Sequence, residues 1–349
     1  MPRPRPVSNP HNRFETTNVE YDEGEAPSER LEIMEEQARS ILTENASPDV
    51  GFRFSLNPYR GCSHGCIYCY ARPTHQYLGL GSGTDFDRRI VVKTNAPELL
   101  AEKLASKRWK REAIAFSGNT DCYQPLELRY GLTRRCLEVC LAYANPVTII
   151  TKGTAIRRDV ELLAALAARA GCRVSVSCAF ADEAMRRAFD PFAPPALARI
   201  ETMRLLADAG LDVCIALAPI IPAVNDSMIP ELLERAAEAG AKRAFMTLVR
   251  LSDETREYFT ARLREALPDR AEKIEHALLE LRGGKRKETR FGHRMRGVGA
   301  RWDTTQQLFE LHCRRHGLVG ASEIDDADLG PMPAPPVAPP GQLRLPLLD

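Results

Sequence analysis

The stretch NPYRGCSHGCIYCYARP spans residues 57–73 and places three cysteines within eight residues. Cys62, Cys66 and Cys69 follow the pattern Cys-x3-Cys-x2-Cys. The run FRFSL (52–56), which comes directly before this stretch, has the composition of a β-strand. Glycines and polar residues around the cysteines predict a loop rather than a helix or a strand. The cysteines are therefore expected on a loop at the end of a strand.

From residue 51 to residue 252, short apolar runs alternate with amphipathic runs of helical period. The predicted strands are 52–56, 113–118, 147–151, 173–180, 212–220 and 244–249, and the predicted helices are 95–106, 131–144, 157–169, 196–209 and 229–239. Continuous apolar strands separated by helices indicate a parallel sheet covered by helices. Six such units form either a doubly wound sheet or an open, partial barrel of the TIM type. In both folds the active groups lie at the carboxyl ends of the strands.

Composition divides the chain into an N-terminal arm, the repeated β/α region, a helical basic extension, a proline-rich linker and a short apolar tail, at residues 1–50, 51–252, 253–325, 326–341 and 342–349. In the arm, residues 28–43 predict one helix with Ser28 as its N-cap. The extension contains RGGKRKETRFGHRMRGVGAR (282–301), which holds eight Lys or Arg and one acid. The composition of the linker predicts a stiff, polyproline-like tether.

The overall charge and the cysteine usage limit the functional classes. The chain has 349 residues and a formal net charge of +1, so a nucleic-acid surface has to be a local patch. No apolar run reaches about 18 residues, and the N-terminus lacks the apolar segment of a secretory signal, so we expect a cytoplasmic protein. In such a protein ten cysteines indicate metal ligation or buried thiols rather than disulfides.

Three thiolates on one short loop suit a [4Fe–4S] cluster, because they hold three irons and leave the fourth without a protein ligand. An open iron can chelate the amino and carboxylate groups of S-adenosylmethionine (SAM) and pass an electron to its sulfonium, which yields methionine and a 5′-deoxyadenosyl radical. The alternative is a zinc site completed by His64 or His75. A third interpretation, three unliganded core thiols, fits poorly with the polar, glycine-rich neighbours. The position after the first strand favours the cluster.

The CxxxCxxC motif, with Tyr68 just before the third cysteine, resembles the signature of the radical SAM superfamily, in which that aromatic side chain lies beside the adenine. The chain also resembles the spore photoproduct lyase-like "DNA repair photolyase" branch of this superfamily, from about Asn57 to Leu251. The similar motifs are NPYRGCxHGCIYCYARPTH, TDxYQPxE, a Thr-Lys after the third strand and APIIPxxND after the fifth. RFGHRMRG (290–297) resembles that group's C-terminal extension. The resemblance implies an α/β fold, a partial (β/α)6 TIM-type barrel. It also implies reductive cleavage of SAM at a [4Fe–4S] cluster, with an external electron donor such as flavodoxin or ferredoxin.

Residues at the strand ends are expected to form the SAM pocket. Asn119 and Thr120 follow the second strand, where such residues either bind the SAM amino group or make a helix cap or turn. The resemblance favours SAM binding. It also implies that Lys152 binds the SAM carboxylate and that Ser177 contacts SAM. The alternatives are a solvated lysine and a small barrel-lining serine. With Tyr68, these residues make up the predicted SAM-binding set.

Cys122 departs from the pattern of the resembling group, which usually has proline between TD and YQP. Cys122 and Tyr123 are candidates for a radical relay. Spore photoproduct lyase uses a nearby cysteine as a hydrogen-atom donor, but that cysteine aligns better with Gly118, which puts thymine-dimer repair in doubt. The remaining cysteines are predicted to be core residues: Cys136, Cys140, Cys172, Cys178, Cys214 and Cys313.

The basic run 282–301 combines Arg and Lys with Phe291 and His293, a mixture that can track phosphates and stack bases. A solvated charged face is the alternative. The sequence thus predicts a radical SAM enzyme acting on a DNA or RNA lesion or modified base. The other hypotheses are a radical SAM enzyme with a protein or small-molecule substrate, and a zinc-binding DNA adaptor without catalysis.

The tail QLRLPL (342–347) resembles the peptide by which bacterial proteins bind the DNA polymerase sliding clamp. In that interpretation Gln342 bonds at the clamp surface, while Leu345 and Leu347 fill an apolar groove. A linear peptide needs an extended tether, which the proline-rich linker supplies. The alternative is an unstructured end with chance leucines.

Overall fold

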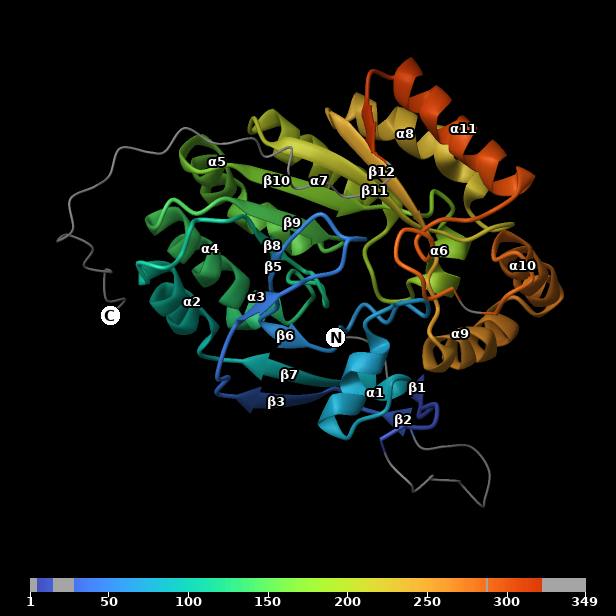
Figure 1. The fold of residues 1–349 in the computed structure, drawn as a ribbon, viewed down its shortest axis with the longest axis horizontal. Coiled ribbons are helices and arrows are strands. Elements are labelled where there is room, and N and C mark those ends of the chain that lie inside the picture. The colour runs from blue at the N-terminus through green and yellow to red at the C-terminus, as the bar shows by residue number, and fades with distance from the viewer. Residues whose placement is uncertain (1–4, 15–27, 287, 322–349) are drawn as a thin grey trace.

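The computed structural model describes residues 5–14, 28–286 and 288–321. Its main sheet has the strand order β13-β12-β11-β10-β9-β8-β5-β4 (Figure 1). The strands are β4 (Leu42–Glu44), β5 (Phe54–Leu56), β8 (Ile114–Phe116), β9 (Val147–Thr151), β10 (Cys172–Ser177), β11 (Asp212–Ile220), β12 (Arg243–Leu248) and β13 (Val319–Ala321). Strand β4 runs antiparallel to β5, and the other neighbouring pairs of this sheet are parallel.

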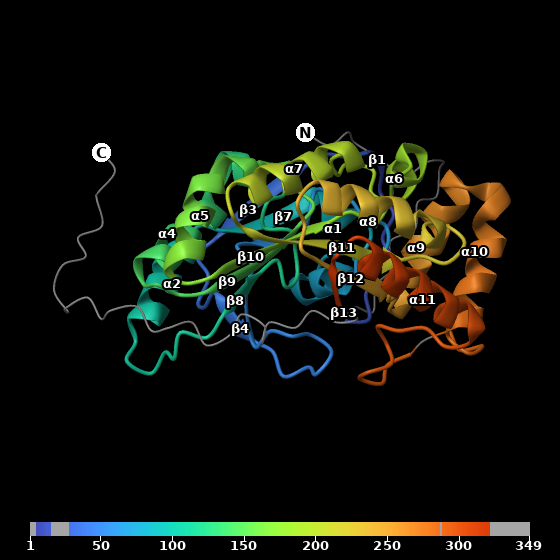
Figure 2. The same cartoon turned by 90° about the horizontal axis from the view of Figure 1, so that it is seen from above.

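The order of the strands decides between the two architectures that the sequence allowed. A doubly wound sheet reverses its strand order at a switch point. Here β5, β8, β9, β10, β11 and β12 lie side by side in chain order, so the chain forms an open, partial (β/α)6 barrel, as predicted. The covering helices lie on one face of the sheet (Figure 2): α2 (Ala96–Ala105), α4 (Leu132–Ala142), α5 (Val160–Arg169), α7 (Ala196–Asp208) and α8 (Ile229–Glu238).

The barrel strands are buried almost along their whole length. Helices cover the outer face of the sheet, and the inner face is turned toward the barrel interior. All residues of β5, β8 and β10 are buried. One continuous apolar core joins Leu56, Phe116, Ile149, Val174 and Ile215 from five neighbouring strands. Such two-sided burial explains why these strands read as continuous apolar runs rather than as alternating ones.

The predicted helix at 28–43 is wrong. This segment forms the strands β2 (Ser28–Glu29), β3 (Glu32–Glu36) and β4, so Ser28 caps no helix. Strand β2 pairs with β1 (Arg5–Pro6), and β3 belongs to a second sheet of order β3-β7-β6, with β7 (Arg89–Lys93) and β6 (Tyr59–Arg60). Ile33 packs on a small apolar cluster that contains Ile90 and Val92. Pairing with β7 therefore overrides the local helix propensity.

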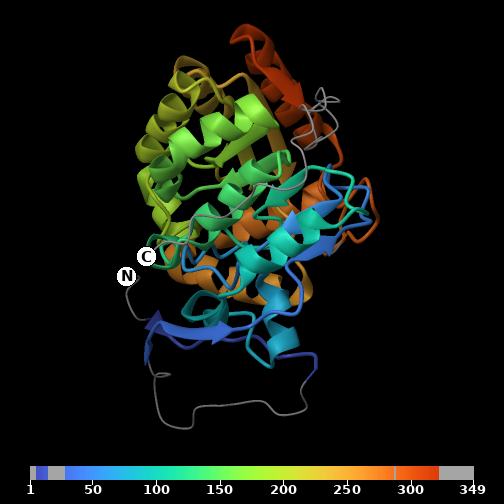
Figure 3. The same cartoon turned by 90° about the vertical axis from the view of Figure 1, so that its left-hand side faces the viewer.

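The C-terminal extension contains α9 (Asp253–Ala266), α10 (Pro268–Leu281) and α11 (Ala300–Arg315). Figure 3 places the blue N-terminal strands and the red α11 at opposite ends of the molecule. Shorter helical segments are η1 (Arg72–Leu78), α1 (Thr84–Arg88), α3 (Glu127–Tyr130), η2 (Thr154–Asp159), α6 (Glu183–Phe189) and η3 (Asp226–Met228). No helix in the described ranges has the length and apolarity to cross a membrane. The linker 326–341 and the clamp-like tail 342–349 lie outside the described residues.

The loop between β4 and β5 is tied to the basic run at the carboxyl end of β12. The Asp49 carboxylate accepts hydrogen bonds from the backbone N–H of Gly292 at 2.5 Å and from the guanidinium of Arg294. Arg294 also donates to Ser47 Oγ at 2.7 Å. The backbone N–H of Leu248, the last residue of β12, donates to the carbonyl of Met295 at 3.0 Å. The basic run is thus held over the strand ends.

Replacing Asp49 by Ala should loosen this tie, because the partly buried Arg294 loses a charged partner. We expect amide hydrogen exchange at residues 290–296 to accelerate by roughly tenfold, as for the loss of a charge-assisted hydrogen bond. Mass-spectrometric exchange measures the effect, with Glu231→Ala on the surface of α8 as the control. Equal exchange in both variants would show that other contacts hold the run.

Candidate active site

A cavity of about 810 Å³ lies at the carboxyl ends of the barrel strands. Its wall combines the cysteine loop with the segments that follow β8 and β9 and with parts of β10, β11 and β12. The cavity brings together the three loop cysteines and the whole predicted SAM-binding set: Cys62, Cys66, Cys69, Tyr68, Asn119, Thr120, Lys152 and Ser177. The barrel therefore brings residues that are more than 100 positions apart in the sequence into one cavity.

The cysteine loop turns sharply at two glycines. Gly61 and Gly65 have φ values of +84° and +69°, a region that side chains other than glycine rarely adopt. A Cβ on Gly61 would lie 2.8 Å from the carbonyl of Phe86, and one on Gly65 would lie 2.7 Å from the ring of Phe192. Glycine is thus required at both positions, for backbone conformation and for space.

Arg72 fixes the middle of the loop. It is fully buried, and its Nε and Nη2 donate to the carbonyl of Cys66 at 3.0 and 2.7 Å. Its Nη1 donates to the carbonyl of Gly83 at 2.6 Å and forms an ion pair with the buried Asp87 at 3.0 Å. A guanidinium with this many fixed acceptors holds the carbonyl of Cys66, and hence the thiol, in one place.

The loop thiols suit a cluster better than a single ion. The three loop thiols line the same cavity, and the zinc alternative needs His64 or His75 as a fourth ligand. His64 Nδ1 instead lies 3.4 Å from Asp121, and His75 Nε2 is hydrogen-bonded to the carbonyl of Arg89 at 2.8 Å. Both histidines of the zinc alternative therefore have other partners.

Burial raises the pKa of Cys62 well above its ordinary value and that of Cys66 to about 12. Thiols with such pKa values become thiolates when bound iron compensates their charge. The three cysteines are the residues that would hold a [4Fe–4S] cluster here. When bound, such a cluster supplies the electron that cleaves SAM.

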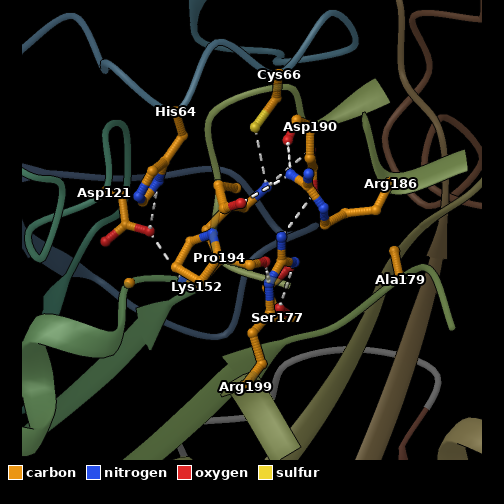
Figure 4. A network of polar contacts seen from close by, with 12 residues as sticks. His64, Cys66, Asp121, Lys152, Ser177, Ala179, Arg186, Asp190, Pro194 and Arg199 are labelled. Atoms are coloured by element: carbon orange, nitrogen blue, oxygen red, sulfur yellow. Dashed lines mark hydrogen bonds and ion pairs between the residues drawn. The ribbon is translucent and has the colours of Figure 1, made fainter. Parts of the chain in front are cut away.

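The ammonium group of Lys152 links the cysteine loop to a buried carboxylate (Figure 4). Its Nζ lies 3.0 Å from Cys66 Sγ, 3.1 Å from Tyr68 Oη and 3.4 Å from Asp190 Oδ1. Burial disfavours its charged form, but the nearby Asp190 carboxylate raises the pKa of Lys152 well above its ordinary value. A fixed positive charge is therefore held in contact with one of the loop thiols.

Asp190 is a site residue that the sequence did not predict. It is fully buried, accepts a 2.5 Å hydrogen bond from Tyr68 Oη and pairs with Arg199 at 3.2 Å. Burial opposes its ionisation, yet Lys152 and Arg199 hold its pKa below the ordinary range. Asp190 follows the short helix α6 in the segment FDPFAPP (189–195), where no motif marks it.

Asp121 joins the ends of β8 and β9 to the cysteine loop. It accepts hydrogen bonds from Thr151 Oγ1 at 2.6 Å and from the backbone N–H of Lys152 at 2.9 Å, and it pairs with His64. Burial opposes its ionisation, but these partners, led by His64, lower its pKa to about 2. Asp121 therefore orients the backbone that carries Lys152.

The other predicted SAM-binding residues are held mainly through backbone groups. The backbone N–H groups of Asn119 and Thr120 donate to Asn57 Oδ1 at 2.8 and 3.2 Å. Thr120 Oγ1 donates to the carbonyl of Tyr59 at 2.7 Å, and Ser177 Oγ donates to the carbonyl of Ala218 at 3.3 Å. These contacts place the turn after β8 at the cavity wall.

Cys122 and Tyr123 are 0% and 1% exposed and lie in the apolar core rather than on the cavity wall. Tyr123 Oη donates to Asp159 Oδ2 at 3.0 Å. Their relay role stays a prediction. Six other cysteines are buried, as predicted: Cys136, Cys140, Cys172, Cys178, Cys214 and Cys313. Tyr70 was not predicted as a site residue, yet it lines the cavity and donates to the carbonyl of Gly118 at 2.8 Å.

Residues 56–236 match the family model of the radical SAM superfamily. The chain belongs to the radical SAM superfamily. Enzymes of this superfamily use a [4Fe–4S] cluster and SAM, in agreement with the cofactors predicted from the cysteine loop. The loop and the strand ends that line the cavity up to β11 fall within the matched range.

Several relatives of this radical SAM protein carry no assigned activity. An uncharacterized protein of Mycobacterium tuberculosis strain H37Rv is 40% identical over 220 residues, which cover 62% of this chain and 65% of the relative. The match thus spans less than two thirds of that relative's length. An uncharacterized protein of Methanocaldococcus jannaschii is 27% identical over 197 residues, 56% of this chain and 71% of that protein.

Among solved structures, spore photoproduct lyase complexed with dinucleoside spore photoproduct is similar, with a TM-score of 0.60 and 16% sequence identity. The match covers 82% of this chain and 81% of the lyase chain. A mutant of the same lyase gives a TM-score of 0.62 at 16% sequence identity. At this identity the comparison establishes the fold.

Replacing Cys66 by Ala should abolish cluster assembly, because two thiolates cannot hold the three irons that this loop would ligate. After anaerobic reconstitution we expect about four irons per wild-type chain and a near-complete loss of iron–sulfur absorption in the variant. Cys140→Ala, in the core away from the cavity, is the matched control and should keep its iron. One zinc per chain without sulfide in the wild type would contradict the cluster.

Replacing Lys152 by Met should make the reduction potential of the reconstituted cluster more negative, because a cation beside Cys66 stabilises the added electron. By Coulomb's law in a protein interior we expect a shift on the order of 100 mV. Spectroelectrochemical titration measures the shift. Lys242→Met, at an exposed position, should leave the potential unchanged, and an unchanged potential in the Lys152 variant would contradict the assignment.

Proposed function

We propose that this radical SAM enzyme acts on a lesion or modified base in DNA or RNA. In this proposal Cys62, Cys66 and Cys69 ligate the cluster, and the predicted SAM-binding set holds SAM in the cavity. The observation that carries the choice of substrate is the contact between the basic run and the cavity. Arg294 and Met295 of that run lie on the cavity wall, together with Arg250 from the end of β12.

Arg250 has the properties of a phosphate-binding residue. Its side chain is exposed, and it makes no hydrogen bond or ion pair with the part of the chain that the structure describes. Desolvation by the surrounding cavity wall and the charge of Arg294 lower its pKa, while Asp49 acts in the opposite direction. Two guanidinium groups beside the Asp49 carboxylate leave a net positive charge at the cavity wall, which favours a ligand that brings negative charge, as a nucleic-acid backbone does.

The excess of positive charge continues beyond the cavity. Arg250 also borders a small recess of about 10 Å³, which Arg256, Arg282 and Arg286 share with Glu288. Burial, followed by the charge of Arg256, lowers the pKa of Arg282 to about 10. The carboxylate of Glu288 is bound by Arg290 rather than by the recess arginines. A polyanion that leaves the cavity along this path would meet more positive than negative side chains.

Exposed aromatic rings at the same cavity suit unstacked bases. Tyr70 and Tyr77 are 54% and 69% exposed and both line the wall. Base–aromatic stacking is a common way to hold single-stranded or extruded nucleotides. The fold match with a lyase whose solved structure contains a dinucleoside lesion also supports a nucleic-acid substrate. A protein or small metabolite would require neither the rings nor the basic path.

Replacing Arg250 by Gln should weaken the binding of a fluorescein-labelled single-stranded oligonucleotide. The slope of log K against log salt should fall by about 0.7, the value for one phosphate contact on a single strand. Fluorescence anisotropy between 50 and 200 mM salt measures both quantities. Arg108→Gln, on the exposed loop after α2, is the control and should behave as the wild type. A wild-type protein that binds no oligonucleotide but cleaves SAM would favour another substrate class.

The sliding-clamp contact belongs to the same proposal. A chain that lacks residues 342–349 should lose binding to an immobilised clamp, while its oligonucleotide affinity stays within about twofold, because the tail would dock into the clamp groove rather than on nucleic acid. Surface plasmon resonance measures the first quantity and anisotropy the second. The substitution Leu345→Ala is the finer variant. Unchanged clamp binding after deletion would remove this partner.

A further inference from the structure

Lys93, the last residue of β7, is a buried lysine at the cavity wall. It is 9% exposed, and its backbone N–H donates to the carbonyl of Pro58 at 2.9 Å. Its ammonium makes no hydrogen bond or ion pair with the residues of the described ranges. A lysine that only packs its stem extends its charge into solvent. The burial of Lys93 instead leaves a cation at the wall of the cavity.

The surroundings of Lys93 leave this positive charge uncompensated. Burial, followed by the charge of Arg60, lowers the pKa of Lys93 to about 8, while Glu36 acts in the opposite direction. The side chain is 9% exposed and lines the cavity, so an anion bound there would offset the cost of its burial. Among the described residues, Glu36 is the acid whose charge raises the pKa of Lys93.

Arg60 is the second cation of this wall. It lies on β6, where it pairs with Val91 of β7, so the antiparallel register brings it close to Lys93. Its contact with Glu36 is long, at 3.9 Å, and both side chains are partly exposed. Arg60 lines the same cavity. Lys93, Arg60 and Glu36 together carry a net charge of +1, which one phosphodiester would neutralise.

We propose that Lys93 and Arg60 form a phosphate subsite that binds one phosphodiester of the substrate strand, an inference that rests on the proposed nucleic-acid function. The subsite belongs to the sheet β3-β7-β6, whereas Arg250 and Arg294 come from the end of β12 and the basic run. Phosphate contacts on two walls would hold a strand across the cavity, with its nucleotide at the cysteine loop. The alternative source of negative charge is the carboxylate of SAM.

The test compares Lys93→Gln with the matched control Lys107→Gln, at an exposed position after α2. Labelled single-stranded oligonucleotide is titrated by anisotropy between 50 and 200 mM salt, and SAM affinity is measured separately by equilibrium dialysis. We expect Lys93→Gln to weaken oligonucleotide binding roughly fivefold and to lower the salt slope by about 0.7. SAM affinity should change less than twofold. Lys93→Met, which keeps the stem, should behave alike if loss of charge is the cause.

Two outcomes would overturn the subsite. One is an unchanged salt slope in both Lys93 variants, and the other is a loss of SAM affinity with unchanged oligonucleotide affinity, which would assign the amine to the SAM carboxylate. A further arm uses inorganic phosphate and reductively ¹³C-methylated protein. If the wild type binds no oligonucleotide but phosphate shifts the Lys93 resonance, the anion subsite stands and the nucleic-acid function fails. If the wild type binds no oligonucleotide and phosphate leaves the Lys93 resonance unchanged, both the anion subsite and the nucleic-acid function are excluded.

Discussion

The contact between the ammonium of Lys152, the thiol of Cys66 and the carboxylate of Asp190 organises the site. A buried carboxylate without cations is costly, so Asp190 has to be met by Lys152 and Arg199. The same lysine also contacts Cys66 of the cysteine loop. The position of the loop is therefore coupled to the charge balance of the barrel interior. Because Lys152 follows β9 and Arg199 lies on α7, the pairing also fixes how two β/α units meet.

Around this centre, the protein positions the loop with rigid devices. Gly61 and Gly65 allow the backbone to turn where any Cβ would collide, and Arg72 binds the carbonyl of Cys66 from inside the protein. Asp121 ties the ends of β8 and β9 together and pairs with His64 of the cysteine loop. Radical chemistry needs such preorganisation, since a reactive intermediate must meet its substrate before it meets the protein.

Beyond the cysteine loop, two parts of the cavity wall carry more positive than negative side chains. The basic run reaches the strand ends because Asp49 binds Gly292 and Arg294, a contact between residues almost 250 positions apart. On the other sheet, the antiparallel pairing of β6 with β7 sets Arg60 near Lys93. Neither arrangement depends on a motif. Both follow from chain topology that brings like charges to one space, where an anionic ligand would relieve their repulsion.

The sequence alone determined the period of the β/α repeat, the strand at 147–151, the loop that carries Cys62, Cys66 and Cys69, and hence the cofactor chemistry, because hydrophobic period and ligand spacing are local properties. The tertiary structure decided the rest. Strand order chose the open barrel over the doubly wound sheet, and pairing with β7 turned the expected helix at 28–43 into strands. It also brought Asp190 to Lys152, since a buried charge selects its partner by distance in space and leaves no spacing rule in the chain.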